Sequence, residues 1–545
     1  MLFRSKNKIL GNKVYLYLTE FFAGMSVMAV ELGASRLLAP YFSSSQIVWT
    51  IIIGTIMIAM ALGNIYGGRT ADRDPNPDRL YRRILIAAVW IALIPVLGKY
   101  IIVGISAVLI FSINTNFLVI AAFVACMLIF VFPLFLLGTV TPSLVKYTVD
   151  SLDDSGKVVG MLNAANTVGS IIGTFVPTFI SIPAVGTSVT FLIFAGILLV
   201  LALIYFISGI RSGRRISAGP VISAVIFIFC CIFGHKSNFA FWLDNLKLED
   251  ESIYNYLQVY ETDRDIVLST NALFGVQSIC RKDGGLSGMY YDYCMAAPYM
   301  AGLHTKERPL DVLVLGMGSG TFAGQCDRYF EGIQTEGVEI DRKITDLAYD
   351  LFELPDHIKV TTYDGRAYLE ALSDDKVYDV IMVDAYQDIT IPFQMSTVEF
   401  FSLIKEHLTS DGVMVVNMNM RGAEEGNINA YLADTISTVF PEVYTADVSG
   451  YTNRELYAGN GGMIQRFHGN TAREADQELI NAMKMVDTGL VKYDAGEHIM
   501  TDDKAPVELL SMRAIDGLIK RETSYYKELY KEKGLGGLLV ELSGN

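Results

Sequence analysis

Long apolar runs occupy the first 240 residues of this 545-residue chain and give way to shorter, mixed runs after Trp242. A helix needs about 20 predominantly apolar residues to cross the hydrocarbon core of a bilayer. Seven runs reach or approach that length, at 14–38, 46–67, 84–106, 117–139, 158–182, 187–208 and 216–233. The pattern therefore predicts a transmembrane domain of about seven helices over residues 1–240.

The polar loops between these runs alternate in charge. Lys and Arg precede the first run and follow the second, fourth and sixth, whereas the loops at 39–45, 107–116 and 183–186 contain neither. The positive-inside rule places the amino terminus and the basic loops in the cytoplasm. Seven spans would leave the carboxyl-terminal half outside the cell. A last run that does not span, or a third helix within 84–139 created by a break near Pro95, would return that half to the cytoplasm.

Charged residues inside the first apolar run stand out, because each costs at least ~2.5 kcal/mol at membrane depth. Glu20, Glu31 and Arg36 either mark a solute pathway, or Glu31 and Arg36 pair near the helix end and fix its packing. The fifth run carries Gly169 and Gly173 at GxxxG spacing. Small residues at that spacing favour close helix contact.

After Trp242 the pattern changes to short alternating runs separated by Asp, Asn and Gly. Over 251–280 these runs indicate hairpins and predict a small antiparallel β domain at 245–300. A tyrosine-rich segment at 289–295 then leads into a predicted helix that ends near Pro298.

From residue 310 apolar strands alternate with helical segments. Strands are predicted at 311–315, 335–340, 358–362, 378–384 and 412–417, with helices between them. This rhythm is typical of an α/β domain with a doubly wound parallel sheet. We place a Rossmann-type domain at 301–520 and a polar tail at 521–545.

Polar features recur where these predicted strands end. A glycine turn at 316–320 follows the first strand, and Glu339, Asp364 and Asp384 follow the next ones. Each acid alone could be a loop residue or a helix cap, Asp364 above all. Ligands of such sheets bind beyond the carboxyl ends of the strands, and glycines let a ligand approach bare backbone. Together the four features predict a nucleotide-like ligand at one sheet edge.

Charge and cysteine content narrow the possible partners. Residues 1–240 carry a net charge of +9, and residues 241–545 carry −24. The acidic half argues against nucleic acid and would suit a cationic substrate, although a solvated acidic surface explains it equally well. The six cysteines show no metal-ligand spacing, so no metal site is predicted and a reducing compartment is favoured.

The motif order resembles the polyamine aminopropyltransferases, the spermidine synthases, in their membrane-fused bacterial branch. The motifs that support this are Leu-Gly-x-Gly-x-Gly at 315–320, Val-Glu-Ile-Asp at 338–341, Asp-Gly at 364–365, Tyr-Asp-Val-Ile-Met-Val-Asp at 378–384, Thr-Asp-Asp-Lys-Ala-Pro-Val-Glu at 501–508, Gly-Thr-Val-Thr-Pro at 138–142 and Asn-Thr-Val-Gly at 166–169. The resemblance covers nearly the whole chain and implies that the Rossmann-type domain is methyltransferase-like.

The resemblance implies aminopropyl transfer from decarboxylated S-adenosylmethionine, a co-substrate and not a tightly bound cofactor, to a di- or polyamine with release of methylthioadenosine. It makes Asp384 the proton acceptor. Positions implied for the nucleoside are Asn255, Gly316, Gly318, Gly320, Glu339, Asp364, Gly365 and Pro392. Positions implied for the amine are Gln277, Tyr291, Ser319, Ala385, Tyr386 and Gln387.

The amine positions depart from the family pattern. Ser319 stands where the family usually has an Asp, and Gln387 stands where it has a second acid, with Asp388 one place late, so the acceptor amine is left open. Two other functions are also open: an S-adenosylmethionine-dependent methyltransferase, and a polyamine-type transporter with a regulatory nucleoside-binding domain. For the leading reading we expect an amine substrate, a lipid bilayer and a homodimer as partners. We also expect a multi-pass protein of the cell membrane, with its catalytic domain in the cytoplasm because the co-substrate is an intracellular metabolite.

Overall fold

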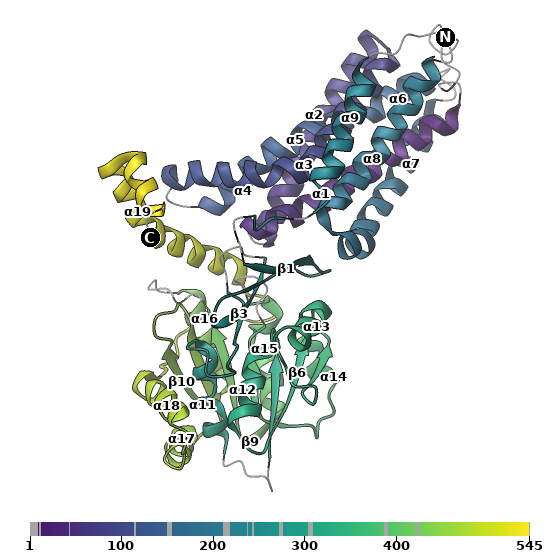
Figure 1. Ribbon diagram of the computed structural model, residues 1–545. Coiled ribbons are helices and arrows are strands. Elements are labelled where there is room, and N and C mark those ends of the chain that lie inside the picture. The colour runs from purple at the N-terminus through teal and green to yellow at the C-terminus, as the bar shows by residue number, and fades with distance from the viewer. Residues whose placement is uncertain are drawn as a thin grey trace. The chain divides into compact units, whose positions relative to one another are not determined.

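The computed structural model describes residues 9, 12–42, 44–113, 116–149, 155–210, 218–236, 238–241, 243, 245–271, 276–302, 309–385, 391–419, 421 and 426–543 (Figure 1). The chain forms two compact units. One comprises Met1–Trp242 with Glu249–Leu257, and the other comprises Leu243–Leu248 with Gln258–Asn545.

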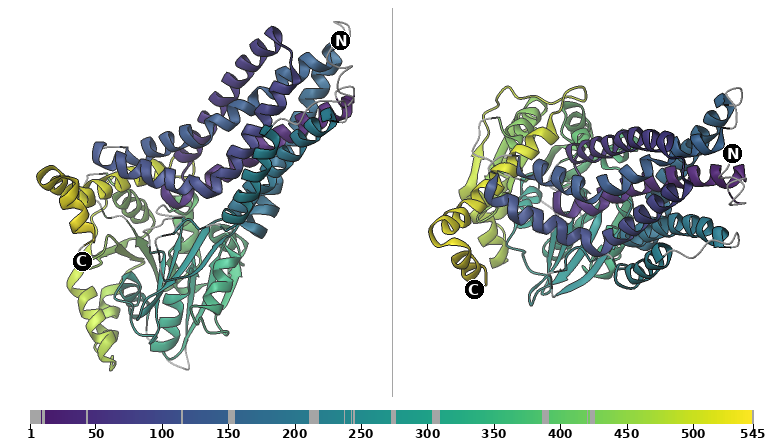
Figure 2. Two further views of the ribbon diagram at one scale, coloured as in Figure 1. Left: turned by 45° about the horizontal axis from the view of Figure 1, so that its top comes forward. Right: turned by 90° about the horizontal axis from the view of Figure 1, so that it is seen from above.

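The first unit is a bundle of long helices that run alongside one another (Figures 1 and 2). Its helices are α1 (Lys13–Phe42), α2 (Gln46–Arg73), α3 (Pro77–Ser112), α4 (Phe117–Ile129), α5 (Val131–Gly138), α6 (Val140–Thr148), α7 (Ser155–Val176), the π-helical turn η3 (Pro177–Ser181), α8 (Ile182–Ile210) and α9 (Ala218–Phe233).

Within the described residues every predicted apolar run is helical, but the helices break at other positions than expected. The alternative that placed a break near Pro95 is wrong, because α3 continues through that proline. Apolar helices tolerate proline where neighbouring helices satisfy the freed backbone groups. The run at 117–139 is instead divided, since α4 ends at Ile129 and α5 begins at Val131.

Five helices among the described residues are long and apolar enough to cross a membrane, judged by length and composition. One of them, Ser155–Ile210, is interrupted at Gly186, whose φ of 80° and ψ of 168° are not helical. Two shorter apolar helices, α4 and α9, accompany these five.

Helix α7 makes the close helix contact that its glycine spacing predicted, and the partner is α1. A Cβ on Gly169 would lie 2.0 Å from the carbonyl oxygen of Phe21, and one on Gly173 would lie 2.1 Å from that of Met25. Neither position accepts a larger residue without moving a backbone. The two glycines therefore set the spacing of these helices.

The predicted small antiparallel sheet is present. Its strands are β1 (Leu246–Glu251), β2 (Tyr256–Glu261), β3 (Asp265–Thr270) and β4 (Ser278–Arg281), in that spatial order. The helix after it was misplaced. The tyrosine-rich segment itself forms α10 (Tyr290–Cys294), and Pro298 lies inside α11 (Ala296–Ala301), where it needs no hydrogen-bond donor in the first turn.

The large sheet of the second unit has the order β12-β10-β11-β9-β8-β5-β6-β7. Its strands are β5 (Leu310–Leu315), β6 (Ile333–Glu339), β7 (Lys359–Thr362), β8 (Tyr378–Val383), β9 (Leu408–Met418), β10 (Glu442–Asp447), β11 (Arg454–Gly459) and β12 (Leu490–Lys492). Strands β5 to β9 pair in parallel, which confirms the predicted rhythm. Strands β10, β11 and β12 add an antiparallel extension that the pattern did not predict.

Helices cover both faces of this sheet. They are α12 (Thr321–Tyr329), α13 (Arg342–Asp350), α14 (Gly365–Ala371), the 3₁₀ turn η4 (Phe393–Met395), α15 (Val398–Glu406), α16 (Ile428–Val439), α17 (Met463–Thr471), α18 (Gln477–Gly489) and α19 (Val507–Ser543). One face packs on α10, α11, α12, α17 and α18, and the other on α14, α15 and α16. The α/β fold class is therefore as expected, with the strand ends of β5, β6 and β8 at one edge.

Candidate active site

The glycine turn after β5 is held against the end of β6. The backbone N–H groups of Gly316 and Met317 both donate to the Val338 carbonyl oxygen, at 2.9 and 3.1 Å. Gly316 has a φ of 86°, and a Cβ there would lie 2.6 Å from the Asp384 carbonyl oxygen. Only glycine fits this left-handed, crowded position. The turn thus brings bare backbone next to the end of β8.

Glu339 faces that turn from the end of β6. Its Oε2 accepts the Gly318 N–H at 3.0 Å, and its Oε1 accepts the Asp341 N–H at 3.0 Å. Its side chain is only 7% exposed, and burial raises its pKa to about 7, although those N–H groups favour the charged form. Asp341 instead caps α13 by accepting the Lys343 N–H.

Asp364 and Gly365 begin α14 beside the glycine turn's strand. Asp364 is an N-cap, because its Oδ1 accepts the Ala367 N–H at 2.9 Å. A Cβ on Gly365 would lie 3.2 Å from the Met395 Cε. Pro392 directly precedes η4, so Asp364–Gly365 and Pro392 belong to neighbouring segments. The capping role is observed, and a nucleoside role for these three residues stays a prediction.

Asp384 lies one residue beyond β8 and is held by two neutral donors. The Tyr290 hydroxyl donates to its Oδ2 at 2.7 Å, and the Asn417 amide donates to its Oδ1 at 2.8 Å. Desolvation, with a smaller contribution from the nearby Glu339, raises the pKa of Asp384 to about 7, although the hydrogen bonds from Asn417 and Tyr290 favour the charged form. A carboxylate oriented by two donors and poised near neutrality is suited to accept a proton.

Three of the residues implied for the amine, Gln277, Tyr291 and Ser319, form hydrogen bonds within the protein. The Tyr291 hydroxyl contacts the Ser278 Oγ at 3.0 Å and donates to the Gln277 carbonyl oxygen at 3.3 Å. Ser319 is buried, and its hydroxyl bonds the Thr321 hydroxyl at 2.9 Å. The Ser319 side chain is therefore hydrogen-bonded to the residue that directly follows the glycine turn. It carries no charge, unlike the Asp that the resembling family usually has at this position.

Four further residues of the predicted site lie in three different places. Ala385 adjoins the glycine turn, since a Cβ on Gly316 would lie 2.7 Å from its backbone. Tyr386 and Gln387 lie outside the described residues. Asn255 belongs to the first unit, in the turn between β1 and β2, where its backbone N–H donates to Ser252 Oγ. Its assignment to the nucleoside stays a prediction.

Three buried polar residues near Asp384 were absent from the predicted site. They are Tyr290, Asn417 and Glu455, which come from α10, β9 and β11. Asn417 gave a weak signal, because it stands at the end of a predicted strand. Glu455 gave none, because β11 was not predicted at all.

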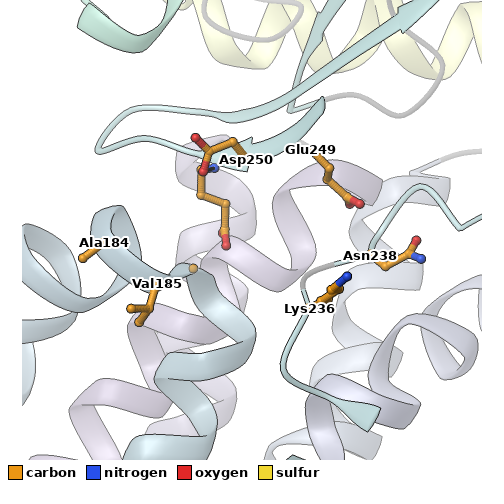
Figure 3. Close-up of a pocket in the computed structure, with 8 residues that line it drawn as sticks. Ala184, Val185, Lys236, Asn238, Glu249 and Asp250 are labelled. Atoms are coloured by element: carbon orange, nitrogen blue, oxygen red, sulfur yellow. Dashed lines mark hydrogen bonds between the residues drawn. The ribbon is translucent and has the colours of Figure 1, made fainter. Parts of the chain in front are cut away.

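A separate pocket of ≈ 470 Å³ lies within the first unit (Figure 3). Glu249 and Asp250 line it from a strand, and Ala184 and Val185 line it from a helix. Glu251, also in its lining, accepts the backbone N–H and the hydroxyl of Thr187, both at 2.5 Å. That carboxylate therefore caps the helical segment that starts after Gly186. In the described parts of the chain, no group of three His, Cys, Asp or Glu side chains could hold a metal ion.

Comparisons with known proteins identify relatives of this chain. Residues 299–455 match the spermine/spermidine synthase domain. A probable polyamine aminopropyl transferase of Bifidobacterium longum (strain NCC 2705) is 50% identical over 355 residues, which cover 62% of this chain and 77% of that protein. The polyamine aminopropyltransferase of Vibrio vulnificus (strain CMCP6) is 28% identical over 36% of this chain and 67% of its own length.

A solved structure of a probable spermidine synthase from Corynebacterium glutamicum ATCC 13032 is 16% identical, covers 47% of this chain and 98% of its own, and has a TM-score of 0.34. A score of that size adds nothing to the assignment, which rests on the sequence relatives. With half of all aligned residues shared with the Bifidobacterium protein, the chain belongs to the polyamine aminopropyltransferase family of enzymes.

Proposed function

We propose that the protein transfers the aminopropyl group of decarboxylated S-adenosylmethionine to a di- or polyamine and releases methylthioadenosine. The observation that supports this best is the placement of Asp384. Its carboxylate is fixed by Tyr290 and Asn417, and its backbone N–H donates to the carbonyl oxygen of Leu315, immediately before the glycine turn. A proton acceptor and a nucleoside cradle therefore share one sheet edge.

The reaction needs a proton acceptor because an ammonium has no lone pair with which to attack carbon. Asp384 accepts one proton from the acceptor amine, whose nitrogen then attacks the methylene carbon bound to the sulfonium. The C–N bond forms as the C–S bond breaks, and the sulfur keeps the bonding electrons as a neutral thioether. Because the sulfonium is already an activated leaving group, the protein mainly orients two cationic partners.

The nucleoside half would hold the adenosyl group by its backbone and one acid. Glu339 would accept hydrogen bonds from the ribose hydroxyls, and the turn at Gly316 and Gly318 would let the sulfonium end approach the backbone. Asp364, Gly365 and Pro392 would line the adenine side. A carboxylate already oriented by the N–H of Gly318 loses little freedom when a ribose binds.

We also propose that the first unit lies in the cell membrane and the second in the cytoplasm. The apolar length of its helices supports a membrane location. The basic loops support a cytoplasmic amino terminus, and the second unit lies on the same side when α9, which is shorter than a typical span, does not cross the bilayer. An amine acceptor and the lipid bilayer are then the partners we propose. A homodimer stays a prediction of the family resemblance.

The test is an assay of the purified full-length protein with decarboxylated S-adenosylmethionine, S-adenosylmethionine and a panel of amines. We expect methylthioadenosine from the first donor, and we expect Asp384→Asn to lower its rate of formation about 100- to 10,000-fold. The exposed Asp374, changed to Asn, is the matched control and should keep full activity. Release of S-adenosylhomocysteine would instead identify a methyltransferase, and no product with either donor would refute the proposal.

A further inference from the structure

Three polar residues form a row across neighbouring strands beside the proposed proton acceptor. Asn417 on β9 lies directly opposite Glu455 on the antiparallel β11. On the other side, β8 and β9 pair in parallel with Val383 opposite Val416, so Asp384 and Asn417 follow at the same level. The hydrogen bond from Asn417 to Asp384 confirms their contact. The row runs Asp384, Asn417, Glu455.

The row lies on one face of the sheet. Residues two apart along a strand share a face. Met382, Val415 and Tyr457, each two positions from a member of the row, all pack in the core beneath α10 and α11. Val383, Val416 and Leu456 pack in the core of the opposite face.

Glu455 is a fully buried acid with half of its hydrogen-bonding capacity unused. Its side chain is 0% exposed, and its Oε2 accepts a weak hydrogen bond from the Cys294 thiol at 3.2 Å. Among the described residues, its Oε1 has no partner. Leaving a buried carboxyl oxygen unpaired is destabilising, and a purely structural role would not require it.

We infer that Glu455 is the second acid of the acceptor site and binds the distal ammonium of a diamine or longer polyamine whose attacking amine lies at Asp384. This inference rests on the proposed function and names its acceptor class. Two strand spacings of about 4.8 Å separate β8 from β11, so the two acids can bind charges several carbon atoms apart. Glu455 would thereby supply the charge that Ser319 lacks.

The surroundings of Glu455 fit a ligand that arrives with its own charge. Burial raises the pKa of Glu455 well above its usual range, and Asp384 raises it further. In the free protein this favours the protonated form of Glu455. An ammonium beside Oε1 would favour the carboxylate, so a dication should bind with release of a proton while a monoamine should not.

The test compares putrescine with butylamine, which has the same carbon chain and one amine. In the wild-type enzyme we expect a far lower KM for putrescine. Glu455→Gln should raise the KM for putrescine about 10- to 100-fold, the range expected for a lost hydrogen bond to a charged group. It should leave the KM for butylamine and the affinity for decarboxylated S-adenosylmethionine within about twofold.

Two controls separate this role from a structural one. Cys294→Ala removes the thiol that contacts Glu455 but keeps the carboxylate, so it should preserve the preference for the diamine. Glu455→Asp keeps a charge and should give an intermediate KM. An equal rise for both amines in Glu455→Gln, an equal loss of preference in Cys294→Ala, or a Glu455→Asp enzyme without the preference would each overturn the inference. Failure of the wild-type enzyme to transfer an aminopropyl group to any amine would refute the proposed function itself.

Discussion

The nucleoside half of the candidate site and its amine half are built from different parts of the sheet. The first uses the ends of parallel strands β5 and β6 and the turn at Gly316, so its groups come from one stretch of consecutive βα units. The second uses Tyr290 before that stretch and Asn417 and Glu455 after it. One half is local in sequence, whereas the other is assembled only when distant segments pack together.

The two halves also differ in the groups that orient their carboxylates. In the nucleoside half, Glu339 is oriented by backbone N–H groups of its own edge. In the amine half, Asp384 is oriented by the side chains of a tyrosine and an asparagine. Backbone donors tolerate many substitutions nearby, but side-chain donors do not. We therefore expect acceptor specificity to change more readily than nucleoside recognition.

The largest effect should follow from Asp384→Asn, which removes the proton acceptor and leaves the nucleoside half intact. General-base catalysis contributes about 100- to 10,000-fold, so kcat should fall by that factor. Calorimetric titration with methylthioadenosine should show affinity within about twofold of wild type. A variant that loses nucleoside affinity as strongly as turnover would show that the two halves are not separable.

The corresponding substitution in the nucleoside half is Glu339→Gln. Losing a charged acceptor for the ribose hydroxyls removes about 1.5–3 kcal/mol, so the KM for decarboxylated S-adenosylmethionine should rise about 10- to 100-fold. The KM for the amine should stay nearly constant. The exposed Glu406, changed to Gln, serves as control. Equal effects on both substrates would contradict a division into halves.

These two halves show which parts of the site a sequence can predict. Gly316, Glu339 and Asp384 each follow an apolar run, and the ends of consecutive parallel strands meet at one edge, so a local pattern locates them. Glu455 can be recognised as part of the site only from its pairing with Asn417. The antiparallel register between β9 and β11 that creates this pairing depends on contacts that no short motif encodes. The same holds for Tyr290, whose direction is set by the packing of α10.

The fold likewise has features that the sequence predicts and features that it does not. The parallel strands and the close contact at Gly169 and Gly173 were predictable because each depends on spacing within one segment. The uninterrupted course of α3 through Pro95 was not, because it depends on what surrounds the proline. The antiparallel extension was missed because short strands such as β12 carry almost no periodic signal.

Activity and stability should change with pH in opposite directions. The pKa values of Asp384 and Glu339 are both raised to about 7. Protonation of the base Asp384 alone should lower kcat/KM about tenfold for each pH unit below that value. The folded protein binds protons that the unfolded chain has already lost between the ordinary carboxyl pKa and 7. The free energy of unfolding of the ligand-free protein should therefore decrease as pH rises through this window.

Denaturant titrations between about pH 5 and pH 8 check this sign. Asp384→Asn should flatten the stability slope, because the amide does not titrate. Glu339→Gln should flatten it too and also lower the apparent pKa of Asp384, since the two carboxylates repel. An unfolding free energy that rises with pH over this range would contradict raised pKa values at the sheet edge.

The smallest effect should come from Asp502→Asn, which tests whether the nucleoside half has support from the carboxyl-terminal segment. The guanidinium of Arg366 donates to both oxygens of Asp502 at 2.7 Å and to the Gln394 carbonyl oxygen at 3.0 Å. Thr397 also donates to Asp502 at 2.7 Å. This network links the start of α14, next to Gly365, with the segment that follows Pro392.

Because the Asp502 side chain is 40% exposed, solvent screens the pair and its loss should cost only about 1 kcal/mol. We expect the KM for decarboxylated S-adenosylmethionine to rise about two- to tenfold, with kcat and the amine KM unchanged. Glu370→Gln, which removes the other acidic partner of Arg366, is the matched control and should stay within about twofold, as expected for an exposed i,i+4 pair. A rise in the amine KM as large as that for the nucleoside would mean that Asp502 braces the whole site and not its nucleoside half.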